Sequence, residues 1–130
     1  MRVADEYFNN IRQIIEQHPE LIMKKARYQV FGKRGGILVG ANKAVNFIKE
    51  NTYGPIRVLG YKDGCRFKEK EPILVIEGYG RELLNLETTY LGFLSYSGCA
   101  TNMRDIVQEA NGVPVIDMAA RHYPWQVIEE

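Results

Sequence analysis

The spacing of the apolar residues switches between a helical and a strand period several times along this chain of 130 residues. Residues 5–17 and 41–51 carry apolar side chains three or four positions apart, which predicts two helices. Residues 56–61 and 72–78 are short runs rich in aliphatic and β-branched side chains, which predicts two strands. A mixed order of helices and strands is typical of an α+β domain.

Turn residues divide the first half of the chain further. Pro19 ends the first helix, because the residue before a proline is pushed out of the helical region. Residues 21–33 alternate in part, and the glycine-rich segment 32–36 then permits a turn before the apolar run 37–39, so we expect a β-hairpin. Asp63-Gly64 predicts a tight turn between the strands at 56–61 and 72–78.

The last third predicts two helices and one isolated strand. Apolar residues mark a helical face between Glu82 and Tyr96, and Ser97-Gly98 predicts a break before a second helix over residues 99–110. Val115-Ile116-Asp117 reads as a short strand that two helices separate from the other strands. A strand in this position marks the start of another unit, and its exposed apolar residues predict self-association.

Composition excludes several classes of protein. The 45% hydrophobic and 25% charged content is that of one globular domain. The 17 Lys and Arg residues balance 16 Asp and Glu residues, so no overall charge attracts nucleic acid. No signal peptide and no apolar run long enough for a membrane span are present, and Cys65 and Cys99 have neither disulfide-framework nor zinc spacing. We therefore expect a soluble cytoplasmic protein.

The densest candidate for chemistry is the polar and aromatic segment 117–126. Strand ends are where α/β folds place their ligands. Arg121 could hold a carboxylate or phosphate with its planar guanidinium, and His122 could donate or accept a hydrogen bond near neutral pH. From the residues alone, the alternative that both side chains simply face solvent stays open.

Three other features have simpler interpretations. The segment 32–36 lacks the spacing of a phosphate-binding loop and lies between strands, which favours a solvated hairpin tip. Glu87-Thr88-Thr89 lies within a predicted helix, where such groups are usually surface or capping residues unless that face meets another subunit. Tyr7 falls on the apolar stripe of the first helix and is more typical of packed core than of a stacking platform.

Several motifs in order give the chain a family resemblance. Glu71-Pro72-Ile73-Leu74-Val75-Ile76-Glu77-Gly78 is followed by Leu86-Glu87-Thr88-Thr89-Tyr90-Leu91-Gly92-Phe93-Leu94, and then by Cys99-Ala100-Thr101-Asn102. Pro114-Val115-Ile116-Asp117 leads into Ala120-Arg121-His122, and Asp5-Glu6-Tyr7-Phe8 stands near the start. Together these segments resemble nicotinate phosphoribosyltransferases and their quinolinate relatives over nearly the whole chain.

The resemblance implies an architecture and a reaction. Residues 1–112 would form an α+β substrate and dimerisation domain with a hammerhead-like segment, and residues 113–130 the first strand of an α/β barrel that is otherwise missing. The family joins nicotinate to phosphoribosyl pyrophosphate, forming nicotinate mononucleotide for NAD synthesis, with Mg²⁺ and ATP bound mostly outside this chain. A homodimer is implied, with a separate barrel chain as a further possible partner. This chain alone would be incomplete and inactive.

The resemblance also implies site residues. Tyr7 would stack on the pyridine ring, and Arg121 with His122 would contact the nicotinate carboxylate or a phosphate. Thr88 stands where the quinolinate enzymes tend to carry an arginine, which favours a monocarboxylate substrate; no residue is identified as catalytic. Two alternatives remain: a non-catalytic ligand-binding or regulatory module derived from the family, and, less favoured, a lipoyl-like carrier modified at Lys62.

Overall fold

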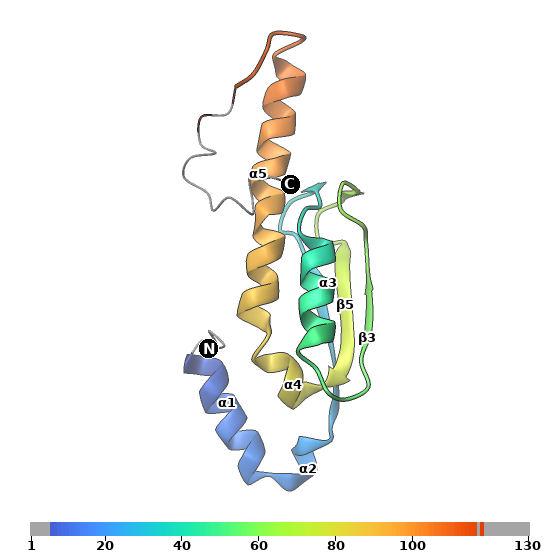
Figure 1. The fold of residues 1–130 in the computed structure, drawn as a ribbon, viewed down its shortest axis with the longest axis vertical. Coiled ribbons are helices and arrows are strands. Elements are labelled where there is room, and N and C mark those ends of the chain that lie inside the picture. Colours follow the sequence, from blue (N-terminus) through green and yellow to red (C-terminus); the bar gives the residue numbers. More distant parts are fainter. Residues whose placement is uncertain (1–5, 117, 119–130) are drawn as a thin grey trace.

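A three-stranded antiparallel sheet packed against helices forms the domain (Figure 1). The computed structural model describes residues 6–116 and 118. In chain order its elements are α1 (Glu6–Gln17), α2 (Pro19–Ile22), β1 (Lys25–Phe31), β2 (Gly36–Ile37), α3 (Ala41–Glu50), β3 (Arg57–Gly60), β4 (Arg66–Phe67), β5 (Pro72–Tyr79), α4 (Gly80–Leu84) and α5 (Glu87–Glu109). The predicted α+β class is confirmed.

Strand β5 is the centre of the sheet, because it pairs with β1 on one side and β3 on the other. One face of the sheet packs against α3 and α5. On the other face, the Glu77 carboxylate forms ion pairs with the neighbouring strands, 3.5 Å from Arg27 Nε and 3.9 Å from an Arg57 guanidinium nitrogen. The core consists of buried hydrophobic residues from β4, β5, α3, α4, α5 and the adjoining loops: Leu38, Ala41, Ala44, Ile48, Phe67, Ile73, Leu74, Ile76, Leu83, Leu86, Tyr90 and Leu94.

Two contacts fix the start of α3. Gly40 has a φ of +84°, and a Cβ there would collide with the carbonyl oxygen of Phe93 on α5, so only glycine allows this approach. The carboxylate of Asp63 accepts hydrogen bonds from the backbone N–H groups of Ala41 at 2.6 Å and Asn42 at 3.1 Å. The predicted Asp63-Gly64 turn therefore also supplies the negative charge that a helix N-terminus favours.

The predicted hairpin between residues 21–33 and 37–39 is wrong. Strand β1 pairs with β5, whereas β2 pairs with β4, a two-residue strand too short to give a periodic sequence pattern. Two backbone hydrogen bonds extend the second pairing, from Leu38 N–H to Cys65 O at 2.9 Å and from Gly64 N–H to Leu38 O at 2.8 Å. The glycine-rich segment thus separates two sheets instead of turning within one.

The predicted helix break at Ser97-Gly98 is also wrong, since α5 runs unbroken for 23 residues. The interruption lies earlier, between α4 and α5 at Asn85 and Leu86. Ser97 is buried, and its hydroxyl accepts a hydrogen bond from Val39 N–H at 2.9 Å and donates one to Val39 O at 3.1 Å. A polar residue that reads as a helix interruption is therefore a tertiary contact.

The chain after α5 leaves one prediction untested. Val115 and Ile116 are in no strand, and Asp117 lies outside the described residues, so the predicted barrel strand and the boundary at residue 113 stay predictions.

Both cysteines are free. Among the residues that the structure describes, no helix is long and apolar enough to span a membrane.

We predict that Ser97→Ala lowers the free energy of unfolding by about 1–3 kcal/mol, because the polar groups of Val39 lose their partner in a largely buried setting. Urea unfolding measures this change. Ser95→Ala is the matched control, since the exposed Ser95 hydroxyl only donates to Gly92 O of its own helix. An equal loss in both variants would contradict the role of Ser97.

Candidate functional site

Two of the predicted site residues, Tyr7 and Thr88, lie toward the same end of the domain. Helix α1 packs against α4, which leads directly into the first turn of α5, where Thr88 is exposed (Figure 1). Tyr7 is 66% exposed and meets the ring of Phe8 edge to face at 5.3 Å between centroids. The expectation that Tyr7 packs in the core is therefore wrong, because no residue of α1 is buried.

The other two predicted site residues cannot be placed beside them. Arg121 and His122 lie outside the described residues, so their proximity to Tyr7 and Thr88 stays a prediction. Within the described part of the chain, no hydrogen bond or ring contact joins Tyr7 to Thr88. What α1 and α5 bring to this end is an exposed aromatic ring and an exposed hydroxyl.

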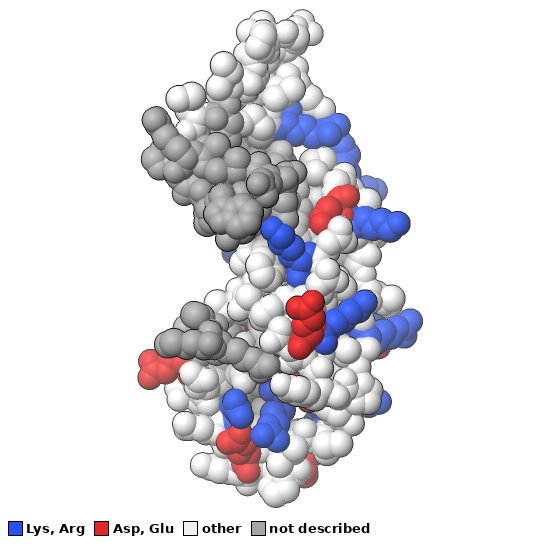
Figure 2. Space-filling view, viewed as in Figure 1, with Lys and Arg blue, Asp and Glu red and all other residues white. Residues whose placement is uncertain are grey.

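A hollow of about 350 Å³ lies where α1, α2 and α4 meet the loop after α3. Its lining combines cations, aromatic rings and amides: Arg12, Ile22, Met23, Asn51, Tyr53, Tyr79, Arg81, Glu82 and Asn85. Glu16 Oε1 lies 3.0 Å from Arg12 Nε and 3.5 Å from an Arg81 guanidinium nitrogen, and so holds the two side chains together. Acidic and basic groups are interleaved at this end of the molecule (Figure 2).

Sequence reasoning missed both arginines. Arg12 and Glu16 stand four residues apart on a helix, a spacing that predicts an ion pair but not a site. Arg81 joins them only through the packing of α1 against α4. Two guanidinium groups beside tyrosine rings can bind a flat anion, since arginine pairs with carboxylates and stacks on aromatic faces.

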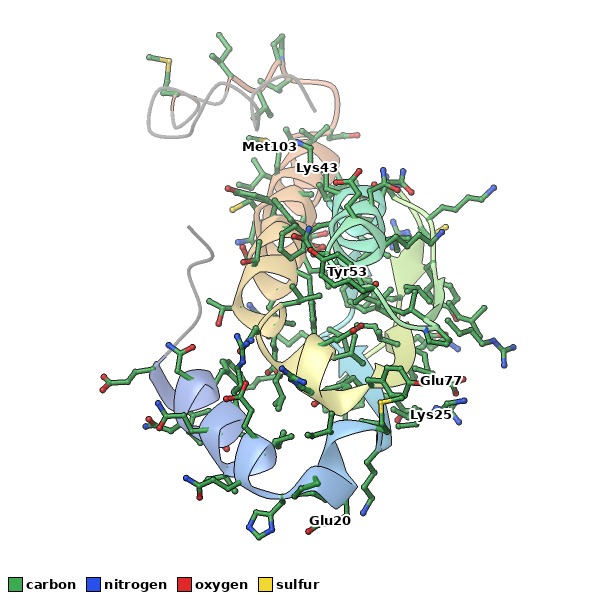
Figure 3. The ribbon with its side chains drawn as sticks, turned by 60° about the horizontal axis from the view of Figure 1, so that its bottom comes forward. Glu20, Lys25, Lys43, Tyr53, Glu77 and Met103 are labelled. Carbon is green, nitrogen blue, oxygen red and sulfur yellow. The ribbon has the colours of Figure 1, made fainter. Side chains whose placement is uncertain are left out.

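Two polar contacts shape the rim of this hollow. Glu82 Oε2 accepts hydrogen bonds from the backbone N–H groups of Tyr53 at 3.3 Å and Gly54 at 3.2 Å, which fixes the loop between α3 and β3. Tyr53 is 89% exposed there, near α4 (Figure 3). The buried Asn85 Oδ1 has no hydrogen-bond partner among the described residues, which leaves an acceptor at the hollow.

A smaller hollow of about 190 Å³ lies between β1 and the first turns of α5, beside Thr88. Its polar lining residues are Tyr28, Gln29, Glu87 and Tyr90. Burial raises the pKa of Tyr28 and that of Tyr90, and the nearby Glu87 carboxylate raises both further. Both phenols are therefore protonated hydrogen-bond donors at neutral pH.

The described residues do not test whether the protein binds the expected Mg²⁺ and ATP. Among residues 6–116 and 118, no group of three or more His, Cys, Asp or Glu side chains is arranged to hold a metal ion. The resemblance itself assigns these sites mostly to the barrel. Both cofactors stay expectations.

Comparison with known sequences points to one family. The profile of the quinolinate phosphoribosyl transferase N-terminal domain matches residues 5–97. The match spans every described element up to the first half of α5, and it includes the end of the domain that carries Tyr7, Arg12 and Thr88. Among curated proteins, no sequence matches the chain significantly.

Solved structures agree on the fold. Nicotinate-nucleotide pyrophosphorylase from Pyrococcus furiosus is 30% identical, with a TM-score of 0.79 over 96% of this chain and 33% of that chain. Two more distant structures share the fold. NadC from Streptococcus pyogenes is 21% identical, with a TM-score of 0.62 over 84% of this chain and 42% of that chain. Human nicotinic acid phosphoribosyltransferase is 17% identical, with a TM-score of 0.65 over 77% of this chain and 27% of that chain. The chain thus spans about a third of the length of the Pyrococcus structure.

We predict that the protein loses stability as the pH rises above about 10, the value at which tyrosine ionises in an unfolded chain. The pKa of Tyr90 is raised in the folded state, so the folded protein binds the phenolic proton more tightly than the unfolded chain does. The stability gained in this way is complete below about pH 10 and is lost as the pH rises from there toward the pKa of Tyr90 in the folded state. Urea unfolding between about pH 8 and about pH 11 measures the loss.

In this experiment Tyr90→Phe should flatten the alkaline loss, because it removes the ionising group and keeps the ring. The residual loss comes from Tyr28 and Tyr61, whose pKa values are also raised, by burial and by the hydrogen bond to Glu71 respectively. The matched control is Tyr53→Phe, on an exposed ring. Identical pH profiles for Tyr90→Phe and the unmodified protein would rule out this role of Tyr90.

Proposed function

The chain belongs to the quinolinate phosphoribosyl transferase family through its N-terminal domain, and on this premise we propose that it is the pyridine-binding part of a phosphoribosyltransferase of NAD biosynthesis. The observation that carries the proposal is the family match over residues 5–97. The 30% identity to a nicotinate-nucleotide pyrophosphorylase supports it. The whole enzyme would join a pyridine carboxylate to phosphoribosyl pyrophosphate and release pyrophosphate.

In this proposal the chain supplies positioning. The exposed ring of Tyr7 stacks on the pyridine, and Arg121 with His122 holds the carboxylate or a phosphate. Arg12 and Arg81, which Glu16 holds together, contribute two guanidinium groups at the same end of the domain. The ring nitrogen must approach the anomeric carbon while the charge of the departing pyrophosphate is neutralised, so orientation and electrostatics dominate the barrier. We place Mg²⁺, ATP and the phosphoribosyl group mainly in the barrel.

We assign nicotinate as the pyridine substrate. Thr88 is uncharged and exposed at the start of α5, and its neighbour Glu87 is acidic. A second carboxylate, as quinolinate carries, would meet an uncharged hydroxyl here instead of a cation. The same arrangement accommodates the single carboxylate of nicotinate, which Arg121 would bind.

The site would be completed across a homodimer, in which the N-terminal domain of one subunit faces the barrel of the other. A separate barrel chain would serve the same purpose. The competing function is a ligand-binding or regulatory module without catalysis. The observation that favours it is that α3, α5 and β5 share a buried hydrophobic core made of described residues of this chain.

Activity of a chimera tests the main proposal. We expect that this chain, joined to the remaining two thirds of the Pyrococcus furiosus protein, converts nicotinate with phosphoribosyl pyrophosphate to its mononucleotide, whereas the chain alone does not. Tyr7→Ala should lower kcat/KM roughly tenfold, about the contribution of one aromatic stacking contact. A folded chimera that binds nicotinate without turnover would favour the non-catalytic module.

Thr88→Arg in the same chimera tests the substrate. A charge-assisted hydrogen bond contributes about 1.5–3 kcal/mol, so the ratio of kcat/KM for quinolinate to that for nicotinate should rise roughly ten- to hundredfold. Ser95→Arg adds the same charge at an exposed position two turns along α5 and should leave this ratio unchanged. A preference for quinolinate in the unmodified chimera would overturn the assignment of nicotinate.

A further inference from the structure

The hollow of about 190 Å³ between β1 and the first turns of α5 carries three polar side chains that the proposed function does not use. These are the phenols of Tyr28 and Tyr90 and the carboxylate of Glu87. Apolar side chains line the rest of it, among them those of Val30, Phe31 and Leu91. We call this hollow, with these six residues, the tyrosine hollow.

The strand and helix periods bring the three polar side chains together. Tyr28 and Val30 lie on the face of β1 that packs toward the core, because alternate residues of a strand point to the same side. Glu87 and Tyr90 stand three residues apart on α5, so they share a face of that helix. The packing of α5 beside β1 then places one carboxylate near two phenols.

The polar groups of the tyrosine hollow lack partners within the protein. Tyr90 is 2% exposed, yet neither its phenol nor that of Tyr28 has a hydrogen-bond partner among the described residues. Over the same part of the chain, Glu87 forms no ion pair. Buried polar groups in proteins are normally hydrogen-bonded, so this arrangement favours a ligand that supplies the partner.

Charge decides which class of ligand fits. Among the described residues that line the hollow, Glu87 is the only charged one, and it stands in the first turn of α5, where the helix dipole favours a negative charge. Burial raises the pKa of both phenols, and the nearby carboxylate raises it further, so both are neutral near pH 7. Aromatic ring faces also attract cations. The lining therefore disfavours phosphates and carboxylates and favours a cation.

From the unpartnered oxygens and the aromatic lining, we propose that the tyrosine hollow binds a primary ammonium group. Such a group has three N–H donors, and the Glu87 carboxylate with the Tyr28 and Tyr90 hydroxyl oxygens offers three acceptors. The apolar side chains of Val30 and Leu91 would contact the alkyl chain that carries the ammonium group.

The size of the hollow limits the ligand further. Pockets for drug-sized ligands measure about 300–1,000 Å³, so a hollow of about 190 Å³ admits an ammonium head and a short alkyl chain. Thr88 does not line this hollow, although it follows Glu87 in the chain. The ammonium site is therefore distinct from the proposed pyridine contacts of Tyr7 and Thr88.

Titration of the 130-residue chain with n-butylammonium chloride, followed by amide NMR shifts, tests the proposal. We expect saturable shifts at residues 28–31 and 87–91. Potassium chloride at the same ionic strength controls for salt effects. Tetramethylammonium chloride carries the positive charge without N–H donors. Both salts should bind at least roughly tenfold more weakly than butylammonium, because each lacks the charge-assisted hydrogen bonds.

Conservative variants assign the binding to the three polar groups. Glu87→Gln keeps the shape and removes the charge, so it should raise the dissociation constant at least roughly tenfold. Glu109→Gln removes the same charge from an exposed position in the last turn of α5 and should leave the constant unchanged. Tyr28→Phe and Tyr90→Phe each remove one acceptor and should raise it roughly three- to tenfold. Tyr53→Phe, on an exposed ring outside the hollow, should have no effect.

The outcomes separate the sources of the ammonium group. Tighter binding of Nα-acetyl-lysine methylamide than of butylammonium would identify a lysine side chain of a partner protein. Equal or tighter binding of butylammonium would identify a free small amine.

Three results would overturn the proposal: no saturable shifts, binding of tetramethylammonium as tight as that of butylammonium, or equal weakening in Glu87→Gln and Glu109→Gln. If Glu87→Gln does not fold, Tyr28→Phe and Tyr90→Phe keep the test available. No barrel and no turnover enter this experiment, so its result is independent of the proposed phosphoribosyl transfer.

Discussion

The structure depends on the burial of β5 beneath α3 and α5. Ile76 and Leu74 of this strand are almost completely inaccessible to solvent, and Ile48 of α3 and Leu86 at the start of α5 share their core. At about 25 cal/mol per Å² of buried apolar surface, such side chains dominate the stability of a small domain. The strand can fill this place because it has pairing partners on both edges.

This packing also positions the proposed pyridine-binding end and the glycine-rich segment. The α4–α5 junction directly follows β5, so Thr88 and Arg81 are fixed to the end of the central strand, and α1 rests on α4. At the other end of β5, the hydroxyls of Ser97 and Thr101 bond to the backbone of Val39 and Ile37, which holds the glycine-rich segment against α5. One helix thus supports both the proposed pyridine-binding end and the glycine-rich segment 32–36.

The two regions differ in what completes them. At the proposed pyridine-binding end, Tyr7 is exposed, and the resemblance assigns the remaining contacts to residues and to a barrel outside the described part of the chain. The glycine-rich segment 32–36 is instead packed against described elements of this chain, β4 and α5.

The sequence by itself determined the α+β class, the helices at 6–17 and 41–50, the strands around 57–60 and 72–79 and the family, because apolar periodicity and motif order are local properties. Only the tertiary structure decided that β1 pairs with β5, that Ser97 anchors a continuous helix, and that Tyr7 lies outside the core. Local sequence does not record which distant strand offers the better apolar partner, or whether a serine meets a backbone 58 residues away. The Arg12–Glu16–Arg81 group likewise unites residues whose proximity comes from packing and not from spacing.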